Sequence, residues 1–424
     1  MKKSIVFKKL LEIKRRFIEN ITAGNIKNHD GKSFTRKRKL TLVRIIVLIL
    51  RCSPYSLQIR LDDFYKEISC KEEVVSKQAF SKARTNLDPD LLKESFILTA
   101  QTLSSCEDLE LYKGKFRLCA FDGSDITLDN NAQLLGHFGG SGRNSDCAAA
   151  LVSLCYDPLN NIILDAGLYP YGRSEREAAR NHFDAVSKLS LPDGAQNLYI
   201  GDRGYPSKEL FAEMIDGGMY FFMRVRKKFN QNFDLVTKKE KVIFEYNGKL
   251  YKVRVFNITL SSGEKEILVT NLPGKYIKYK EAAELYFTRW GIETKLDSLK
   301  NKLELENMSG RRVVTTYQDF WAKLDLANTM AALEYATDEV IEEKTADCEN
   351  KYRQRTNENR LITKFSEKYI ELMAVDNDEE RLALFDELVS DISMRPVEVK
   401  PDRQHKRVTP RKKKFCDRRK RVLR

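Results

Sequence analysis

The chain has 424 residues, of which 42% are hydrophobic and 32% are charged, and its formal net charge is +14. This balance excludes collagen-like, mucin-like and wholly disordered chains and provides apolar residues for about two to four domains. No segment approaches the roughly 18 apolar residues of a membrane-spanning helix, and Lys8 and Lys9 interrupt any signal-peptide core, so we expect a protein with no membrane partner.

Positive charge is concentrated at the two ends of the chain. Residues 1–44 hold 14 Lys and Arg against three acids, and residues 400–424 hold 13 against two, so the segment between them is acidic overall. Basic ends of this kind are typical of proteins that grip a polyanion, although solvated tails give the same pattern.

Nucleotide and zinc chemistry have no support in the motifs. The eight cysteines form no CxxC pair, and there are only four histidines. The single Gly-Lys-Ser run, at Gly31, has Ile26 where a phosphate-binding loop needs a glycine. We therefore expect no nucleotide cofactor.

The first 112 residues read as helical. Apolar residues from Ile5 to Ile18 recur at helical spacing, and a second helix is predicted over 71–87. In that second helix Lys77, Ser81 and Arg84 share the face opposite an apolar stripe, which is typical both of a DNA-recognition helix and of an ordinary surface helix. Asp88-Pro89 ends it and begins the next helix.

From about residue 113 the pattern changes to alternating strands and helices. Strands are predicted over 116–121, 148–156, 161–169, 197–201 and 220–225, with helices from Ser174 and Ser207 between the later ones. This order indicates an α/β domain whose first three strands form a meander. Residues 228–272 then alternate strongly around an Asn247-Gly248 hairpin signal, which predicts an all-β insertion.

The rest of the chain is predicted to be helical up to the basic tail. One long helix is expected over 281–306, followed by helices that include 320–345 and 358–372. The predicted domains are a helical DNA-binding region (1–112), a catalytic domain (113–312) with its β insertion, a helical C-terminal region (313–395) and a basic tail (396–424).

Two aspartates follow buried strands. Asp122 comes after FRLCAF, and Asp202 comes after NLYIG. Ligand sites in open α/β sheets form at the carboxyl ends of strands. A single aspartate there is usually a turn former, but two of them, the second in Asp202-Arg203-Gly204-Tyr205, favour a site.

The predicted long helix carries a third acid among cations. At 100° per residue, Tyr286, Arg289, Glu293 and Lys300 lie within one 60° sector. This pattern is unusual for a core stripe and favours a metal-binding Glu293 beside phosphate-binding Arg289 and Lys300. Asp297 lies on nearly the same face and remains a competing ligand, and a salt-bridge ladder is the structural alternative.

These residues resemble a known family. The spacing of Tyr286, Arg289, Glu293 and Lys300 matches the Y-(2)-R-(3)-E-(6)-K signature of insertion-sequence transposases of the IS4 type, and Asp122 and Asp202 look like the first two acids of their DDE triad. The resemblance runs from about residue 71 to at least 330, and it includes the segments KQAFSKAR, FFMRVR, LVTNLP and RWGIETKLDSLKNKLELE.

The resemblance implies an RNase H-like mixed-sheet core of the α/β class with an all-β insertion and helical flanking regions. It implies metal binding by Asp122, Asp202 and Glu293, with Mg²⁺ or Mn²⁺ as two ions. Tyr286, Arg289, Lys300 and Arg203 would contact phosphate or DNA. The implied partners are double-stranded DNA, as transposon terminal inverted repeats and target DNA, and a second copy in a homodimer. The implied location is the cytoplasm of a bacterium, at the nucleoid.

By this interpretation the reaction is cleavage at transposon ends followed by transfer of the 3′-hydroxyl strand into target DNA. An RNase H-like nuclease without strand transfer and a non-catalytic DNA-binding derivative are the alternatives. Sequence-specific DNA contacts are assigned to Lys77, Ser81 and Arg84. The related hairpin-forming enzymes use an aromatic residue of the insertion, whereas both tryptophans here, Trp290 and Trp321, lie outside it, which leaves the cleavage pathway open.

Overall fold

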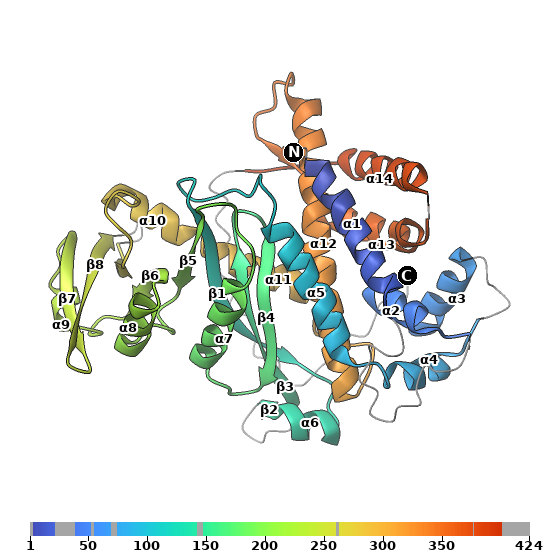
Figure 1. The fold of residues 1–424 in the computed structure, drawn as a ribbon, viewed down its shortest axis with the longest axis horizontal. Coiled ribbons are helices and arrows are strands. Elements are labelled where there is room, and N and C mark those ends of the chain that lie inside the picture. Colours follow the sequence, from blue (N-terminus) through green and yellow to red (C-terminus); the bar gives the residue numbers. More distant parts are fainter. Residues whose placement is uncertain are drawn as a thin grey trace. The chain divides into compact units, whose positions relative to one another are not determined.

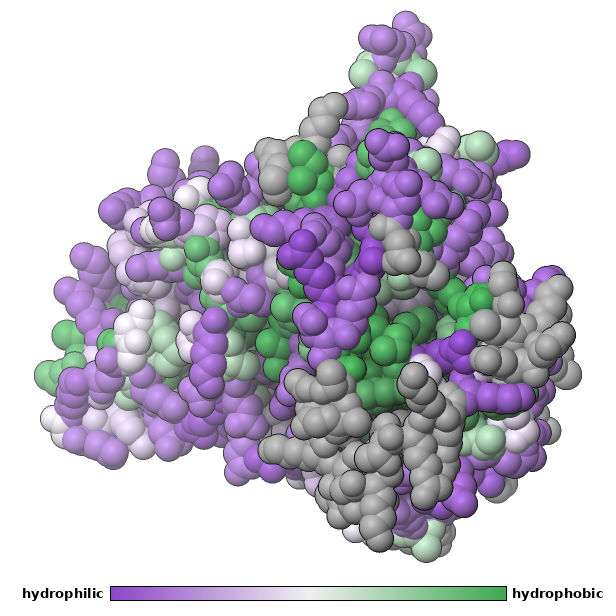
Figure 2. All heavy atoms as spheres, turned by 45° about the vertical axis from the view of Figure 1, so that its right-hand side comes forward, coloured by the Kyte–Doolittle hydropathy of each residue, from purple (hydrophilic) through white to green (hydrophobic). Residues whose placement is uncertain are grey.

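The structure is a computed structural model that describes residues 3–21, 39–51, 55–68, 74–141, 147–259, 263–375 and 377–400. Most of the basic tail and part of the basic N-terminal segment lie outside these ranges. Within them, no helix is long and apolar enough to cross a membrane. Hydrophilic side chains cover most of the described surface that Figure 2 shows.

The chain divides into two compact units, each built from separated segments. Unit 1 comprises residues 1–103, 126–150 and 299–424, and unit 2 comprises residues 104–125 and 151–298. The elements that lie wholly or mainly in unit 1 are α1 (Lys3–Glu19), α2 (Leu42–Leu50), α3 (Leu57–Glu67), α4 (Lys77–Arg84), α5 (Pro89–Ser104), α6 (Ala132–Phe138), β2 (Gly140–Ser141), α12 (Val313–Thr345), β10 (Gln354–Arg355), α13 (Glu358–Ala374), α14 (Asp378–Ser393) and β11 (Val397–Glu398).

In unit 1 the first and last described helices pack against one long helix. α12 lies beside α1 and α14, as the orange, blue and red ribbons of Figure 1 show. The amphipathic pattern predicted for the N-terminal segment is confirmed, because Phe7 is buried between Phe365 and Phe385, with ring centroids 6.1 and 5.1 Å away.

The other elements belong to the mixed sheet and its helices. They are β1 (Phe116–Thr127), β3 (Cys147–Asp157), β4 (Ile162–Pro170), α7 (Glu175–Ser187), β5 (Gln196–Gly201), α8 (Lys208–Asp216), β6 (Tyr220–Val225), α9 (Gln231–Asp234), β7 (Lys239–Tyr246), β8 (Lys249–Thr259), β9 (Lys265–Thr270), α10 (Tyr279–Phe287) and α11 (Trp290–Asn301).

Nine strands form one sheet in the order β2-β3-β1-β5-β6-β9-β8-β7, with β4 paired to β3. β1, β5 and β6 run parallel, with Ala120 opposite Ile200 and Gly201 opposite Met223. β3 and β4 pair across a four-residue connection, so they form the expected antiparallel turn. The mixed α/β, RNase H-like arrangement expected from the sequence is confirmed.

The predicted β insertion extends this same sheet. β9 pairs antiparallel with β6, β8 with β9, and β7 with β8. The hairpin predicted at Asn247-Gly248 is confirmed: Tyr246 faces Lys249, and both turn residues have positive φ.

Alternating residues of the central strands build a core on each face of the sheet. On one face Leu118, Ile200 and Phe222 pack against α10. On the other, Phe121 and Tyr199 pack against Phe183 of α7. The sheet is therefore held between helices, and its strand ends are fixed by packing on both sides.

Three predicted boundaries are wrong. β1 continues through Asp122 to Thr127 rather than ending at Phe121, and α4 covers only 77–84 of the described part of 71–87. The helix predicted over 281–306 is two helices, α10 and α11. They are separated at Thr288-Arg289, where hydrogen bonds tighten from i+4 to i+3, as in Arg289 N to Tyr286 O.

Candidate active site

Asp122, Asp202 and Glu293, the candidate triad, come from three elements that all lie in unit 2. Asp122 is in β1, Asp202 follows β5 directly, and Glu293 is in the first turn of α11. β1 and β5 are neighbouring parallel strands whose pairing ends at Ala120 and Ile200, two residues before each aspartate. This register brings both aspartates to one end of the sheet.

Asp122 lies in a partly enclosed environment. Its Oδ1 accepts a hydrogen bond from the Gly123 N–H at 3.0 Å, and 22% of its side chain is exposed. Burial raises the pKa of Asp122 to about 6. The charges of Glu293 and Glu175 act in the same direction, while the Gly123 N–H and the charge of Arg289 oppose the shift. The position therefore favours a nearby cation.

Asp202 is placed by close packing before it and by a hydrogen bond from α10. A Cβ added at Gly201 would stand 2.6 Å from the ring of Phe121, so only glycine permits this approach of β5 to β1. The Tyr286 hydroxyl donates to Asp202 Oδ1 at 3.0 Å. Its ring contacts Phe222, and burial raises the pKa of Tyr286, so the hydroxyl keeps its proton and stays a donor.

Arg289 connects the other two acids. Its Nη2 donates to Glu293 Oε1 at 2.8 Å, and its Nη1 lies 3.8 Å from Asp122 Oδ2. The side chain is 3% exposed. Burial alone would lower its pKa, but Tyr286, Glu293 and Asp202 outweigh burial and raise it, so the guanidinium is charged. The signature residues thus contact every member of the candidate triad.

The break between α10 and α11 is fixed by the turn after β3. A Cβ at Gly291 would lie 2.9 Å from Pro158 Cβ, so α11 packs almost against the backbone of that turn. Lys295 donates to Asn161 Oδ1 at 2.9 Å from the same side. These contacts set the start of α11 and with it the position of Glu293.

The two remaining helix positions behave differently from Glu293. Asp297, the competing ligand, is exposed, whereas Glu293 is half-buried against Arg289. Lys300 lies in the last turn of α11, seven residues after Glu293, which helical periodicity places on nearly the same face. Lys300 belongs to unit 1, whereas Glu293 belongs to unit 2.

The triad suits a hard divalent cation. Three carboxylates offer the oxygen ligands that Mg²⁺ and Mn²⁺ prefer. In the described parts of the chain, however, no three His, Cys, Asp or Glu side chains are gathered closely enough to hold a metal as they stand. Arg289 and Tyr286 occupy carboxylate oxygens instead.

The predicted DNA contacts on α4 separate into two kinds. Lys77 and Ser81 are exposed. Arg84 is 2% exposed, and its guanidinium donates to Asp319 at 2.9 Å, to Gln318 at 2.9 Å and to Ser309 at 2.5 Å. The expectation that Arg84 presents itself to DNA is therefore wrong, because its partners on and before α12 enclose it.

Sequence reasoning missed two groups beside the triad. Tyr205 has a buried hydroxyl, and the charges of Asp122, Glu175 and Asp202 act on it. Glu175 carbons lie 3.3 Å from the Cβ position of Gly123. Tyr205 belongs to the Asp-Arg-Gly-Tyr motif, so the sequence contains a signal for it. Glu175 lies in the first turn of a helix, where an acidic residue is common, so the sequence does not distinguish it.

The same unit holds a Ser-His-Asp chain that is structural. Ser153 Oγ lies 2.8 Å from His182 Nε2, and His182 Nδ1 lies 2.6 Å from Asp165 Oδ2. Ser153 is 1% exposed and His182 is fully buried. No substrate reaches this serine, so the chain ties α7 to β3 and β4 rather than forming a hydrolase site.

A family model described as a transposase DDE domain matches residues 113–328, which is half of the chain. The chain belongs to the transposase DDE domain family. The enzyme class predicted from the sequence, a DDE transposase that cleaves and joins DNA, is confirmed at this level. The family also implies dependence on a divalent metal ion.

No curated protein matches the sequence. Among solved structures, the chain is similar to the cryo-EM structure of piggyBac transposase in a synaptic complex with hairpin DNA. The identity is 11%, the TM-score is 0.47, and the alignment covers 95% of this chain and 87% of that one.

Proposed function

We propose that this transposase is of the IS4 type and that Asp122, Asp202 and Glu293 are its catalytic carboxylates. The observation that carries the proposal is the way Arg289 contacts both Asp122 and Glu293 while Tyr286 contacts Asp202. Two residues of one helical signature thus meet acids from two neighbouring strands. The proposed reaction is cleavage at transposon ends followed by transfer of the freed 3′-hydroxyl strand into target DNA.

The three carboxylates would hold Mg²⁺ or Mn²⁺, as two ions. Such ions, when bound, lower the pKa of an attacking water or 3′-hydroxyl and stabilise the charge that develops on the leaving 3′-oxygen. Because Arg289 and Tyr286 now contact the carboxylates, metal binding requires these two side chains to give up or share those contacts. The displaced guanidinium would remain beside the site as a phosphate ligand.

The chain's own residues then have distinct tasks. Tyr286 orients Asp202, and Arg289 aligns Glu293 and Asp122. We assign phosphate binding on the DNA strand to Lys300, two turns along α11, and to the exposed Arg203, next to Asp202. The reaction needs in-line positioning of the phosphate, which these cations would supply.

The regions outside the catalytic domain would bind the DNA. We assign reading of the terminal inverted repeats to the helical region 1–112, with Lys77 and Ser81 on the exposed face of α4. The catalytic domain is assigned to 113–312, the helical C-terminal region to 313–395 and the basic tail to 396–424. We propose a homodimer that bridges two transposon ends and then binds target DNA.

The direct test compares two carboxylates on one helix. Wild type, Glu293→Gln and Asp297→Asn are incubated with Mg²⁺ and DNA that carries the element's own ends. Cleavage by wild type and Asp297→Asn, with end binding but no cleavage by Glu293→Gln, supports the proposal. The opposite result would move the third ligand to Asp297.

Joining distinguishes a transposase from a simple nuclease. Pre-cleaved ends with a 3′-hydroxyl are mixed with target plasmid, and joined products are measured by gel electrophoresis. Joined products that depend on Asp122, Asp202 and Glu293 support strand transfer. Cleavage without joining would indicate the nuclease alternative, and end binding without either reaction would indicate a non-catalytic DNA-binding derivative.

A further inference from the structure

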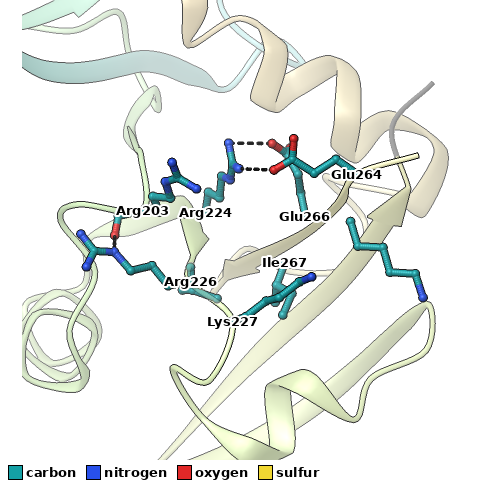
Figure 3. Close-up of a pocket in the computed structure, with 9 residues that line it drawn as sticks. Arg203, Arg224, Arg226, Lys227, Glu264, Glu266 and Ile267 are labelled. Carbon is teal, nitrogen blue, oxygen red and sulfur yellow. Dashed lines mark hydrogen bonds and ion pairs between the residues drawn. The ribbon is translucent and has the colours of Figure 1, made fainter. Parts of the chain in front are cut away.

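A basic pocket opens beside the candidate triad within unit 2. Its volume is about 560 Å³. Figure 3 shows charged side chains around it, from the end of β6, the start of β9 and the loop after β5. We call it the β6–β9 pocket, and its lining residues are Arg203, Arg224, Val225, Arg226, Lys227, Glu264, Lys265, Glu266 and Ile267.

Positive charge exceeds negative charge in the β6–β9 pocket. Five of its residues are cationic and two are acidic. Both acids are engaged by one arginine: Arg224 Nη1 lies 2.7 Å from Glu266, and Nη2 lies 3.3 Å from Glu264 (Figure 3). Arg226 donates its Nε to the Arg203 carbonyl oxygen at 3.2 Å.

The other four cations have no acidic partner in the described part of the chain. Among the residues that the structure describes, no carboxylate lies within ion-pair distance of Arg203, Arg226, Lys227 or Lys265, and all four are exposed. Cations gathered around one pocket repel each other unless an anion binds. The pocket is therefore built for a polyanion or a phosphate group.

The two glutamates hold Arg224 unequally. Glu266 is 7% exposed and makes the shorter contact, so it fixes the position of the Arg224 guanidinium. Glu264 is 60% exposed and makes the longer contact. An ion pair with so exposed a carboxylate contributes little to stability, so a phosphate oxygen can replace Glu264 on Arg224.

The pocket is next to the candidate triad in sequence, and its charged residues interact electrostatically with residues of the active site. Arg203 directly follows Asp202 in sequence. The charge of Arg224 acts on the Tyr286 hydroxyl, and the charges of Asp202 and Arg289 act on Glu266. A ligand in the pocket would thus lie next to the DNA position that the triad attacks.

We propose that the β6–β9 pocket binds a backbone phosphate of the DNA strand next to the cleavage position, and that Glu264 holds the place of this phosphate on Arg224 until DNA arrives. This inference rests on the proposed function. It adds a binding site formed by Arg224, Arg226, Lys227 and Lys265, and it assigns Glu264 as the partner exchanged on binding.

DNA binding across a salt series tests the proposal in full-length protein without added metal. The variants are Arg226→Gln/Lys227→Gln, Glu264→Gln and, as a control outside the pocket, Lys249→Gln, which changes an exposed lysine of β8 that already pairs with Asp216. Fluorescence anisotropy of an element-end duplex gives the affinity. The plot of log affinity against log salt should flatten by about 0.9 for each phosphate that the double variant no longer binds.

Removing the placeholder should act in the opposite direction. Glu264→Gln is expected to bind DNA about threefold more tightly than wild type, while Lys249→Gln keeps the wild-type slope. A double variant with the slope and affinity of Lys249→Gln would overturn the proposed phosphate contact. Unchanged or weaker binding by Glu264→Gln would overturn the placeholder role.

A free nucleotide offers the same phosphate chemistry, so AMP binding is measured by calorimetry in parallel. AMP binding that the double variant loses, with unchanged DNA binding, would make the pocket a small-anion site and contradict the DNA assignment. The cleavage assay separates the two levels of inference. If the wild-type protein binds DNA through the pocket but never cleaves it, the proposal for the pocket is supported and the proposed function is refuted.

Discussion

Tyr286 joins the apolar core to the candidate triad, since its ring packs against Phe222 while its hydroxyl donates to Asp202. Tyr286→Phe keeps the ring and removes the donor. A hydrogen bond to a charged group contributes about 1.5–3 kcal/mol, so we expect cleavage to slow by roughly 10- to 100-fold with little change in Tm. Cleavage rates and thermal unfolding measure the two effects.

The same helix offers a matched control for this variant. Tyr279 also lies on α10, and its hydroxyl donates to the Asn257 carbonyl oxygen at 2.9 Å, away from the triad. Tyr279→Phe should leave cleavage at the wild-type rate. Equal losses in both variants would mean that the hydroxyls act through helix packing rather than through Asp202.

Asp157 is a buried acid outside the active site whose titration is linked to stability. It accepts hydrogen bonds from Leu159 N at 3.0 Å and from Asn160 Nδ2 at 2.7 Å. Burial raises its pKa to about 7, although these bonds and the charge of Arg117 oppose the shift. The folded state therefore binds this proton more tightly than the unfolded state does.

This linkage predicts how stability depends on pH. The contribution of protonated Asp157 to the free energy of unfolding is fully present below its unfolded pKa near 4 and is lost as the pH rises through about 7. The loss is about 1.4 kcal/mol for each unit by which the folded pKa exceeds the unfolded pKa. Asp157→Asn cannot ionise, so its free energy of unfolding should fall less than that of wild type between pH 5 and pH 8. Urea unfolding at both pH values measures the difference, and parallel curves would refute the assignment.

At the scale of elements, Arg84 fixes α4 to α12. Asp319 is buried, and although burial raises its pKa, Arg84, Lys323 and the Ser309 hydrogen bonds hold the pKa at about 2. Removing one member of a buried pair leaves an unpaired charge. Arg84→Met should therefore lower the free energy of unfolding by about 3–5 kcal/mol.

Two further variants separate packing from DNA binding. Arg84→Met combined with Asp319→Leu removes both charges and should recover much of the lost stability. Lys82→Met changes an exposed cation of the same helix and should leave stability as in wild type. Chemical unfolding measures the stability of all three variants. A stable Arg84→Met protein with weakened DNA binding would indicate that Arg84 contacts DNA.

These elements also mark where sequence reasoning ends. The parallel strands, the Asn247-Gly248 hairpin and the acids near the strand ends could be predicted because local patterns encode them. The burial of Arg84 could not, because its partner Asp319 is 235 residues away. The break before Glu293 depends on Gly291 meeting Pro158, a tertiary contact with no local signal.

At the scale of the whole molecule, the basic ends are not uniformly available to DNA. Lys14 in α1 is 2% exposed and pairs with Asp325 of α12 at 2.5 Å, while Ser95 and Thr99 also donate to that carboxylate. Burial lowers the pKa of Lys14, and Asp325 opposes the change. Part of the N-terminal charge thus stabilises unit 1. We therefore expect the C-terminal tail to make more of the contacts with DNA phosphates than the N-terminal segment does.

Residues 401–424, which lie outside the described ranges, carry 12 Lys and Arg against two acids. Each cation that meets a phosphate releases counterions, so deleting this segment should flatten the plot of log affinity against log salt by about 0.9 for each phosphate that is no longer neutralised. The control replaces it with a Gly/Ser tail of equal length, which separates charge from chain length. Anisotropy with specific and unrelated duplexes should show equal reductions in affinity for both, because backbone contacts carry no sequence information. An unchanged slope would show that the tail does not bind DNA. A reduction confined to the specific duplex would show that the tail recognises the DNA sequence.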